Sequence, residues 1–253
     1  MPTDATGTVT LVIGGKPYSF PVVNGVANVY LPDLTNGNYD YTITYSGDNK
    51  YSSFTKSASI TMNNIIPTTI TASAVTTVYN GGKYLVATLT DSQGNPISGV
   101  AVTIKLSKGK TATPTTDKNG QVKFSTNGLA PKTYTATISF DGNANYDKST
   151  KSVKVTVKKA TPKVITKSKT FKKSVKTKKY TMTLKTNKNN AMKKMNVYLK
   201  VKGKTFKATT NSKGKATFKI KNLKKKGKYY ATVTYKGNKY YNKVTKKVKI
   251  TVK

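Results

Sequence analysis

The sequence predicts an all-β protein built from antiparallel β-sandwiches in tandem. The first observation is an internal repeat. The segments Y-S-G-D-N-K-Y, F-D-G-N-A-N-Y and Y-K-G-N-K-Y-Y carry glycines at Gly47, Gly142 and Gly237, which are 95 residues apart each time. A fixed period of this length in a chain of 253 residues indicates an array of domains. The second observation is that apolar residues alternate with a period of two, which is typical of strands. No segment shows a helical period.

Two prolines indicate where the domains meet. Pro67 and Pro162 are also 95 residues apart, and each follows a strand-like ending. We therefore divide the chain into residues 1–65, 66–159 and 160–253, called repeats 1, 2 and 3. Thr6–Ile13 of repeat 1 already matches the strand at Val102 of repeat 2, so repeat 1 lacks about 30 residues at its front relative to the other repeats. We expect this chain to be a C-terminal piece of a longer protein.

The strands of repeats 2 and 3 follow one order. Each repeat opens with two strands, which in repeat 2 lie around Thr68–Val75 and Lys83–Thr90. A third strand follows, and then a hairpin in which Gly120 or Gly214 supplies the positive φ that the turn requires. The third strand is carried by Val102, Ile104 and Leu106 in repeat 2, and by Val197, Leu199 and Val201 in repeat 3.

A tyrosine-rich strand precedes the glycine turn in every repeat. A leucine and a second turn come before this strand, which suggests a cross-over into a last hairpin held by buried tyrosines. About seven short strands per repeat, separated by turns, are typical of an immunoglobulin-like sandwich. The residues on one face of the strand are Tyr39, Tyr41, Ile43 and Tyr45, then Tyr134, Ala136, Ile138 and Phe140, then Tyr229, Ala231, Val233 and Tyr235.

Several short segments of repeats 1 and 2 resemble those of a known family of repeats. The segments G-N-P-I-S-G-V (Gly94–Val100), T-D-K-N-G (Thr116–Gly120) and Y-T-A-T-I-S-F-D-G-N-A-N-Y (Tyr134–Tyr146) resemble the bacterial immunoglobulin-like repeats of invasin and intimin type. Repeat 1, with Asp4–Thr10 and Tyr41–Tyr51, is most similar to repeats in adhesin-like surface proteins of methanogenic archaea. The resemblance implies a stalk of spacer domains at the cell surface or in the cell wall.

The residue inventory argues against catalysis. The chain contains no Cys, His, Trp, Glu or Arg, so all 46 basic residues are Lys and all 8 acidic residues are Asp. General acid–base catalysis usually depends on His or Glu, and zinc and iron sites depend on His and Cys. We expect no enzymatic activity, no metal site and no cofactor. No apolar run approaches membrane-spanning length, so we also expect no membrane insertion in this segment.

The positive charge is concentrated in repeat 3. Repeat 1 has 3 Lys and 4 Asp, repeat 2 has 12 Lys and 4 Asp, and repeat 3 has 31 Lys and no acidic residue. The lysines of repeat 3 mostly alternate with apolar residues, which predicts a cationic solvent face over an apolar core. Lysine on exposed strands also discourages edge pairing, and a Lys-rich composition can reflect genome bias. Bias, however, would act on repeat 1 as well.

We therefore expect repeat 3 to tether the chain to an extended polyanion. The archaeal resemblance implies that this partner is an anionic, pseudomurein-like cell-wall polymer or a surface glycan, while repeats 1 and 2 act as spacers. Extra tyrosines, absent from repeat 2, could stack on sugar rings or merely reflect β-propensity on a wet face. The candidate polyanion- and glycan-binding residues are Tyr198, Lys224, Lys225, Lys226, Lys228, Tyr230, Lys236, Lys239, Tyr240, Lys243, Lys246 and Lys247.

Two alternatives remain open. Repeat 3 could face outward and adhere to other cells, or the chain could be a purely structural spacer that binds polyanions without specificity. Nucleic acid would bind such a cation through its phosphates, and tyrosines could stack on bases. The chain has no Arg for bidentate base or phosphate contacts and no recognised nucleic-acid motif, so we expect nucleic-acid binding to be nonspecific.

Overall fold

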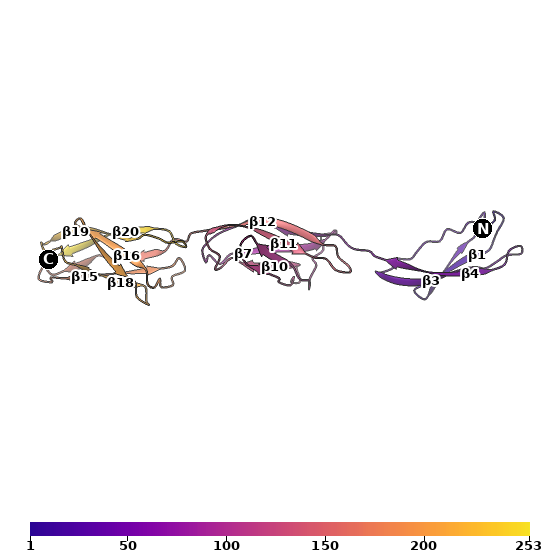
Figure 1. Cartoon of the computed structure of the whole chain (residues 1–253), viewed down its shortest axis with the longest axis horizontal. Helices are drawn as coiled ribbons and strands as arrows, with labels where there is room; N and C mark the ends of the chain where they lie inside the picture. The colour runs from indigo at the N-terminus through magenta and orange to yellow at the C-terminus, as the bar shows by residue number, and fades with distance from the viewer. The chain divides into compact units, whose positions relative to one another are not determined.

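The computed structural model describes residues 1–253 and contains strands and no helix, which confirms the predicted all-β class (Figure 1). Its contacts group the chain into two compact units. One unit comprises Met1–Thr69 with Thr90–Asn95 and Phe140–Ser149, and the other comprises the remaining residues. No helix is long and apolar enough to cross a membrane. The sheets, in contrast, follow the three repeats, and each repeat is described below by its own sheets.

Repeat 3 folds as a two-sheet sandwich. Its strands are β13 (Lys163–Ile165), β14 (Lys169–Phe171), β15 (Lys178–Lys185), β16 (Asn196–Val201), β17 (Lys204–Thr209), β18 (Lys215–Ile220), β19 (Gly227–Tyr235) and β20 (Val244–Val252). One sheet has the order β13–β15–β18, and the other has the order β14–β20–β19–β16–β17. Apolar side chains from both sheets, such as Phe218 and Val233, are completely buried in one core. Two sheets around one core are the arrangement of an immunoglobulin-like sandwich.

Repeat 2 has the same topology. Its strands are β5 (Thr68–Ala72), β6 (Val75–Val78), β7 (Tyr84–Asp91), β8 (Thr103–Leu106), β9 (Thr111–Ala112), β10 (Gln121–Ser125), β11 (Lys132–Phe140) and β12 (Ser149–Lys158). The sheet orders are β10–β7–β5 and β6–β12–β11–β8–β9. The third strand buries Ile104 and Leu106 as the alternation predicts. Tandem immunoglobulin-like sandwiches are thus the fold of this chain.

The first strand of each complete repeat changes sheets midway. The sequence predicts one strand around Thr68–Val75, but the structure has two. The first half, β5, lies in the three-stranded sheet, and the second half, β6, pairs in parallel with β12 of the five-stranded sheet. In repeat 3, β13 pairs with β15, and β14 pairs in parallel with β20. A strand that switches sheets closes one corner of a sandwich. The prediction of a single strand was therefore wrong.

Repeat 1 has only one of the two sheets. Its strands are β1 (Thr8–Ile13), β2 (Lys16–Pro21), β3 (Gly37–Tyr45) and β4 (Phe54–Met62), in the order β2–β1–β3–β4. Between β2 and β3, the segment that matches the Gly120 hairpin of repeat 2 forms only one isolated bridge, between Val23 and Val26. In the complete repeats the matching strand pairs with β7 or β15, and repeat 1 has no counterpart of either. Val22 belongs to a small buried cluster with Ala5, Val9 and Tyr45.

A tyrosine fastens the cross-over before the last hairpin in every repeat. Each phenol donates a hydrogen bond to the carbonyl oxygen four residues upstream, as in the tyrosine corner of immunoglobulin-type domains. The cross-over is therefore held by a buried or half-buried side chain, as the sequence predicts. The three bonds are Tyr39 to Thr35 at 3.1 Å, Tyr134 to Ala130 at 2.9 Å and Tyr229 to Lys225 at 2.8 Å.

The repeated glycine turn is an Asx turn. After each glycine, one side-chain oxygen accepts the backbone N–H groups two and three residues further along, which is how Asx turns close. The acceptors are Asp48, Asn143 and Asn238. The preceding Gly237 has a φ of 83°, and a Cβ there would approach the backbone to 2.8 Å. Only glycine fits this position, which explains why the motif recurs.

Candidate functional site

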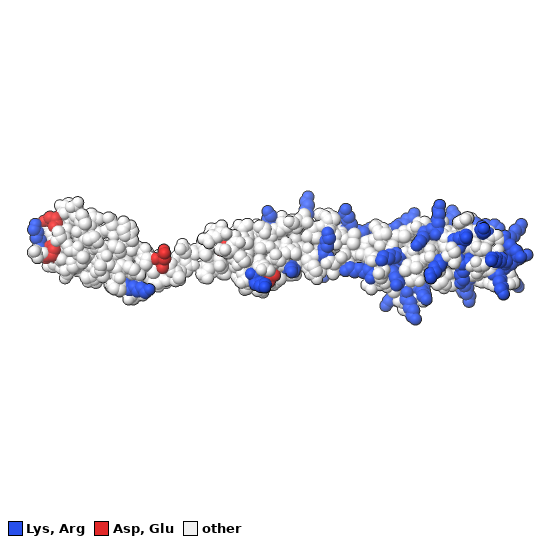
Figure 2. Space-filling model, turned by 180° about the vertical axis from the view of Figure 1, so that it is seen from behind, with Lys and Arg blue, Asp and Glu red and all other residues white.

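Lysine side chains crowd the surface of repeat 3. In Figure 2 they cover this part of the chain with no acidic side chain among them, whereas repeat 1 shows only a few charged groups. The only ion pair in the structure joins Lys50 to Asp4 in repeat 1, with 3.0 Å between the nitrogen and oxygen atoms. No lysine of repeat 3 is therefore neutralised by a carboxylate side chain of the chain itself.

Repeat 3 forms with a neutral side chain a turn that repeat 2 forms with an aspartate. In repeat 2, Asp117 accepts the backbone N–H groups of Asn119 and Gln121 on one side-chain oxygen. In repeat 3, Asn211 accepts the two matching N–H groups at 3.0 Å each. Neutral acceptors thus replace carboxylates at positions where a hydrogen bond, not a charge, sustains the turn. The positive field of repeat 3 is preserved while its geometry is unchanged.

The outer face of the five-stranded sheet holds four of the predicted residues. Tyr198 on β16 points out beside Lys236, whose nitrogen lies 4.5 Å from the centre of the tyrosine ring. Tyr230 on β19 is 73% exposed and pairs across the sheet with Lys249 of β20. Lys228 and Lys247 face the same side, because they alternate with buried core residues. Exposed aromatic rings among ammonium groups can bind anionic sugars by stacking and by charge.

The other eight predicted residues lie in loops or at a strand start. Lys224, Lys225 and Lys226 precede β19, while Lys236, Lys239, Tyr240 and Lys243 follow it, so the two groups lie at opposite ends of that strand. Lys246 shares the core side of β20 with Val248 but is exposed. The predicted residues therefore form three groups: one on the sheet face and one at each end of the sandwich.

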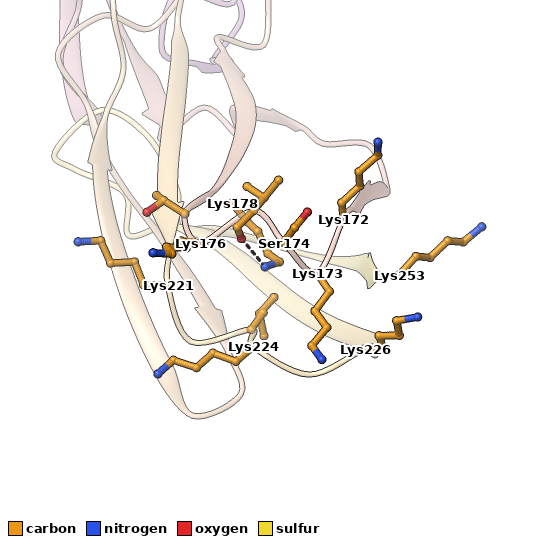
Figure 3. A pocket seen from close by; sticks show the side chains of 12 residues that line it. Lys172, Lys173, Ser174, Lys176, Lys178, Lys221, Lys224, Lys226 and Lys253 are labelled. Carbon is orange, nitrogen blue, oxygen red and sulfur yellow. Dashed lines mark hydrogen bonds between the residues drawn. The ribbon is translucent and has the colours of Figure 1, made fainter.

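One end of repeat 3 contains a pocket that the sequence analysis did not predict. It lies between loop A, residues 172–177, and loop B, residues 221–226, and its volume is about 1080 Å³ (Figure 3). Eight lysines line this lysine pocket together with Val175 and Leu223. Loop A contributes Lys172, Lys173 and Lys176, loop B contributes Lys221, Lys224 and Lys226, and the remaining two are Lys178 and Lys253.

Lys178 is the exception to the rule that lysines face solvent. It is the first residue of β15, and only 1% of it is exposed. Its ammonium group donates one hydrogen bond, to the carbonyl oxygen of Val175 at 2.8 Å. The sequence contains a signal for this burial. In the alternation along β15, Lys178 falls on the same side of the strand as the buried Tyr180, Met182 and Leu184. That signal is not sufficient, because the matching Lys83 of repeat 2 has the same relation to the buried Leu85 and is exposed.

Repeat 3 presents cationic donors, and the chain has no cluster of side chains that could hold a metal ion. Three or more His, Cys, Asp or Glu side chains are nowhere clustered in the chain. What the surface of repeat 3 offers is a dense set of hydrogen-bond donors with positive charge. Such a surface can bind carboxylate, phosphate or sulfate groups.

Comparisons with known proteins do not assign a family. A family model described as the carboxypeptidase regulatory-like domain matches residues 85–167, which is less than half of the chain. No curated protein matches the chain. Among solved structures, a 1.5-MDa bacterial ice-binding adhesin is 17% identical, with a TM-score of 0.36, over 98% of this chain and 87% of that one.

Two further solved structures are similar at the same level. A Ca²⁺-stabilised adhesin of an Antarctic bacterium is 18% identical, with a TM-score of 0.32, over 99% of this chain and 66% of that one. Invasin, a bacterial integrin-binding protein, is 17% identical, with a TM-score of 0.43, over 74% of this chain and 39% of that one. These neighbours are bacterial surface proteins, and none of them concerns the expected archaeal relationship.

Proposed function

We propose that this chain is part of the stalk of a cell-surface, adhesin-like protein. In this proposal repeats 1 and 2 are spacers, and repeat 3 attaches the chain to an anionic cell-wall polymer such as pseudomurein. Its role is mechanical and adhesive, without catalysis. Tandem immunoglobulin-like sandwiches suit a spacer, because each complete repeat has its own core.

The main support for this proposal is that two repeats with the same fold differ strongly in charge. Repeats 2 and 3 share their topology, yet repeat 3 has 31 lysines and no acid, against 12 lysines and 4 aspartates. Asn211 preserves a turn that Asp117 forms in repeat 2. Repeat 2 shows that the fold does not require this positive charge. Its concentration in repeat 3 therefore supports a binding role for that repeat. A polymer with many regularly spaced anions is the partner that satisfies so many cations at once.

Binding of the whole chain to wall material tests this function. Chains 1–253 and 1–159 are sedimented with purified pseudomurein walls, with a neutral polysaccharide and with duplex DNA, across a salt series. We expect only the chain that contains repeat 3 to sediment with the walls, and to do so at physiological ionic strength. The truncated chain is a matched control, because all strands of repeats 1 and 2 lie before residue 159.

Each alternative predicts a different outcome. Equal sedimentation of both chains, or release from walls at modest salt while DNA competes freely, would contradict the tether and favour a spacer with a nonspecific cationic surface. Binding to intact foreign cells but not to the cell's own wall polymer would favour an outward-facing adhesion domain. Release of soluble wall fragments over time would reveal an enzyme.

A further inference from the structure

We propose that the lysine pocket of repeat 3 binds one acidic sugar, a hexuronate unit of an anionic glycan. The inference rests on the proposed function and deepens it, because it assigns recognition of the polymer to one place on a surface that is cationic throughout. Three observations carry it: an open gap between two loops, a buried ammonium group with too few partners, and an apolar floor beneath a cationic rim.

The gap exists because loops A and B are not joined. In repeat 2 the matching loops are tied together, since the side chain of Asn80 accepts the N–H of Gly128 at 2.8 Å and that of Asn127 accepts the N–H of Gly82 at 3.1 Å. Repeat 3 has no hydrogen bond between residues 172–178 and 221–226. The same end of the sandwich is thus closed in the spacer repeat and open in the cationic one.

The buried ammonium group of Lys178 requires an anion. An ammonium carries three donors, and the one bond to Val175 leaves two of them without a protein acceptor. Burial of a charge without a partner is costly, and repeat 3 contains no carboxylate side chain that could pay that cost. In repeat 2 the matching residue, Lys83, is exposed. Lys178 is therefore a fixed donor in the pocket wall, available to a bound carboxylate.

The pocket also offers an apolar surface, which distinguishes a sugar from a bare ion. Leu223 and Val175 line it, and the methylene stems of the surrounding lysines extend this surface. In Figure 3 the side chains of Lys224 and Lys226 extend away from loop B, while Lys178 lies between the two loops, where its ammonium group bonds to the carbonyl oxygen of Val175. The C–H face of a pyranose ring can pack on the floor while its carboxylate meets Lys178 and the rim lysines close over it.

The test measures binding of trigalacturonate to the full chain by calorimetry, with neutral galactotriose and inorganic phosphate as comparison probes. The variants are Lys178→Met, which replaces the buried ammonium by an apolar chain of similar length, and the surface pair Lys224→Gln/Lys226→Gln. The control pair Lys193→Gln/Lys213→Gln removes the same charge from exposed loop positions outside the pocket. Thermal melts confirm folding, and backbone amide shifts of residues 172–178 and 221–226 report the site.

We expect trigalacturonate to shift those amides. Loss of one charge-assisted bond predicts that each pocket variant weakens binding about tenfold or more, while the control pair changes it less than about twofold. Equal losses in the pocket and control pairs would overturn the pocket and leave the polycation tether intact. Phosphate binding as tight as trigalacturonate binding, with the same amide shifts, would overturn the assignment to a sugar. Failure of the full chain to bind any wall polymer is a separate result, which overturns the tether.

Discussion

The side-chain oxygen of Asn238 accepts the backbone N–H of Tyr241 at 2.9 Å and so closes the last turn of repeat 3. Asp48 closes the matching turn of repeat 1 by accepting the N–H of Tyr51 at 2.8 Å. Aspartate and asparagine are interchangeable for this bond, because both present the same oxygen at the same distance from the backbone. This bond therefore does not decide which of the two is present, although in repeat 1 the second carboxylate oxygen of Asp48 has partners of its own.

Restoring aspartate to these turns separates the charge of repeat 3 from its fold. The double variant Asn211→Asp/Asn238→Asp is expected to keep the turns and to raise the melting temperature of repeat 3 at low salt, since two carboxylates then stand among many lysines. Salt at about 1 M shortens the Debye length to about 3 Å and should remove the gain. Differential scanning calorimetry across a salt series measures both effects.

The control for that variant is Asn143→Asp in repeat 2. It makes the same chemical change in the same turn but in a weaker positive field, so its gain should be smaller. Wall binding of the double variant should decrease as its stability rises. A stability gain that is independent of salt would show that charge repulsion within repeat 3 is not its cause.

Asp48 should make the stability of repeat 1 dependent on acid pH. The backbone N–H of Thr6 lowers the pKa of Asp48 strongly, and the N–H groups of Lys50 and Tyr51 add to this effect. A carboxyl whose pKa is lowered on folding contributes stability above its unfolded pKa, about 3.9, and loses it as the pH falls towards the folded value. The melting temperature of repeat 1 should therefore decrease as the pH is lowered below about 4.

Asp48→Asn provides the check on that assignment. The other carboxylate oxygen of Asp48 accepts the Thr6 N–H at 2.7 Å and the Tyr45 hydroxyl at 2.9 Å. An amide nitrogen at this position would face donors, so we expect the variant to be less stable at neutral pH. It should lose the acid dependence that Asp48 causes and keep a smaller one from Asp4, whose pKa is lowered by its hydrogen bonds to Tyr51 and Lys50. A pH profile identical to that of the unmodified chain would exclude Asp48 as the titrating group. Tryptophan is absent from the chain, so tyrosine fluorescence or circular dichroism serves as the probe.

The tyrosine corner should contribute measurably to the stability of each complete repeat. Tyr229→Phe removes one hydrogen bond, to the carbonyl of Lys225, and little else, so we expect a loss of about 1 kcal/mol in the free energy of unfolding. Tyr134→Phe in repeat 2 should lose a similar amount, because its bond to Ala130 is equivalent. Urea unfolding measures both values. Tyr230→Phe is the control, since Tyr230 is exposed, and a comparable loss there would contradict the role of the corner.

The sequence predicted the strands well because alternation reports burial directly. Ile104, Leu106 and their counterparts lie on the core face where period two places them. The split into β5 and β6 was missed because no glycine or proline marks the break between Ala72 and Val75. Which half joins which sheet depends on β7 and β12, and such long-range pairing leaves no local signal.

The candidate site was predicted in part, for a similar reason. Alternation correctly places Tyr198 and Tyr230 on the outer face of the sheet, because each lies between core residues on its strand. The lysine pocket was missed, since it is formed by two loops that are distant in sequence and that differ from repeat 2 chiefly in lacking the Asn80 and Asn127 bonds. Composition shows how many lysines there are but not that a gap lies among them.

Repeat 1 offers a test of why a strand forms at all. Residues 27–36 have no strand, although the matching segments of the complete repeats include β10 and β18. These strands obtain their hydrogen bonds from β7 and β15, so we expect backbone amides of residues 27–36 to exchange with solvent far faster than those of residues 121–125 and 215–220. Hydrogen-exchange mass spectrometry of the full chain measures all three segments in one experiment.

A chimera then tests the missing partner as the cause. Residues 66–100, which contain β5, β6 and β7, are placed directly before residue 6, because Thr6 corresponds to Ala101 in the repeat. The added β7 should pair with residues near Val26, slow their exchange and cover Leu31, which is exposed in repeat 1 and corresponds to the buried Thr126. A scrambled version of the added segment has the same length and composition and should have no effect. Protection by the scrambled segment, or fast exchange in the intact chimera, would show that residues 27–36 resist strand formation for a reason in their own sequence.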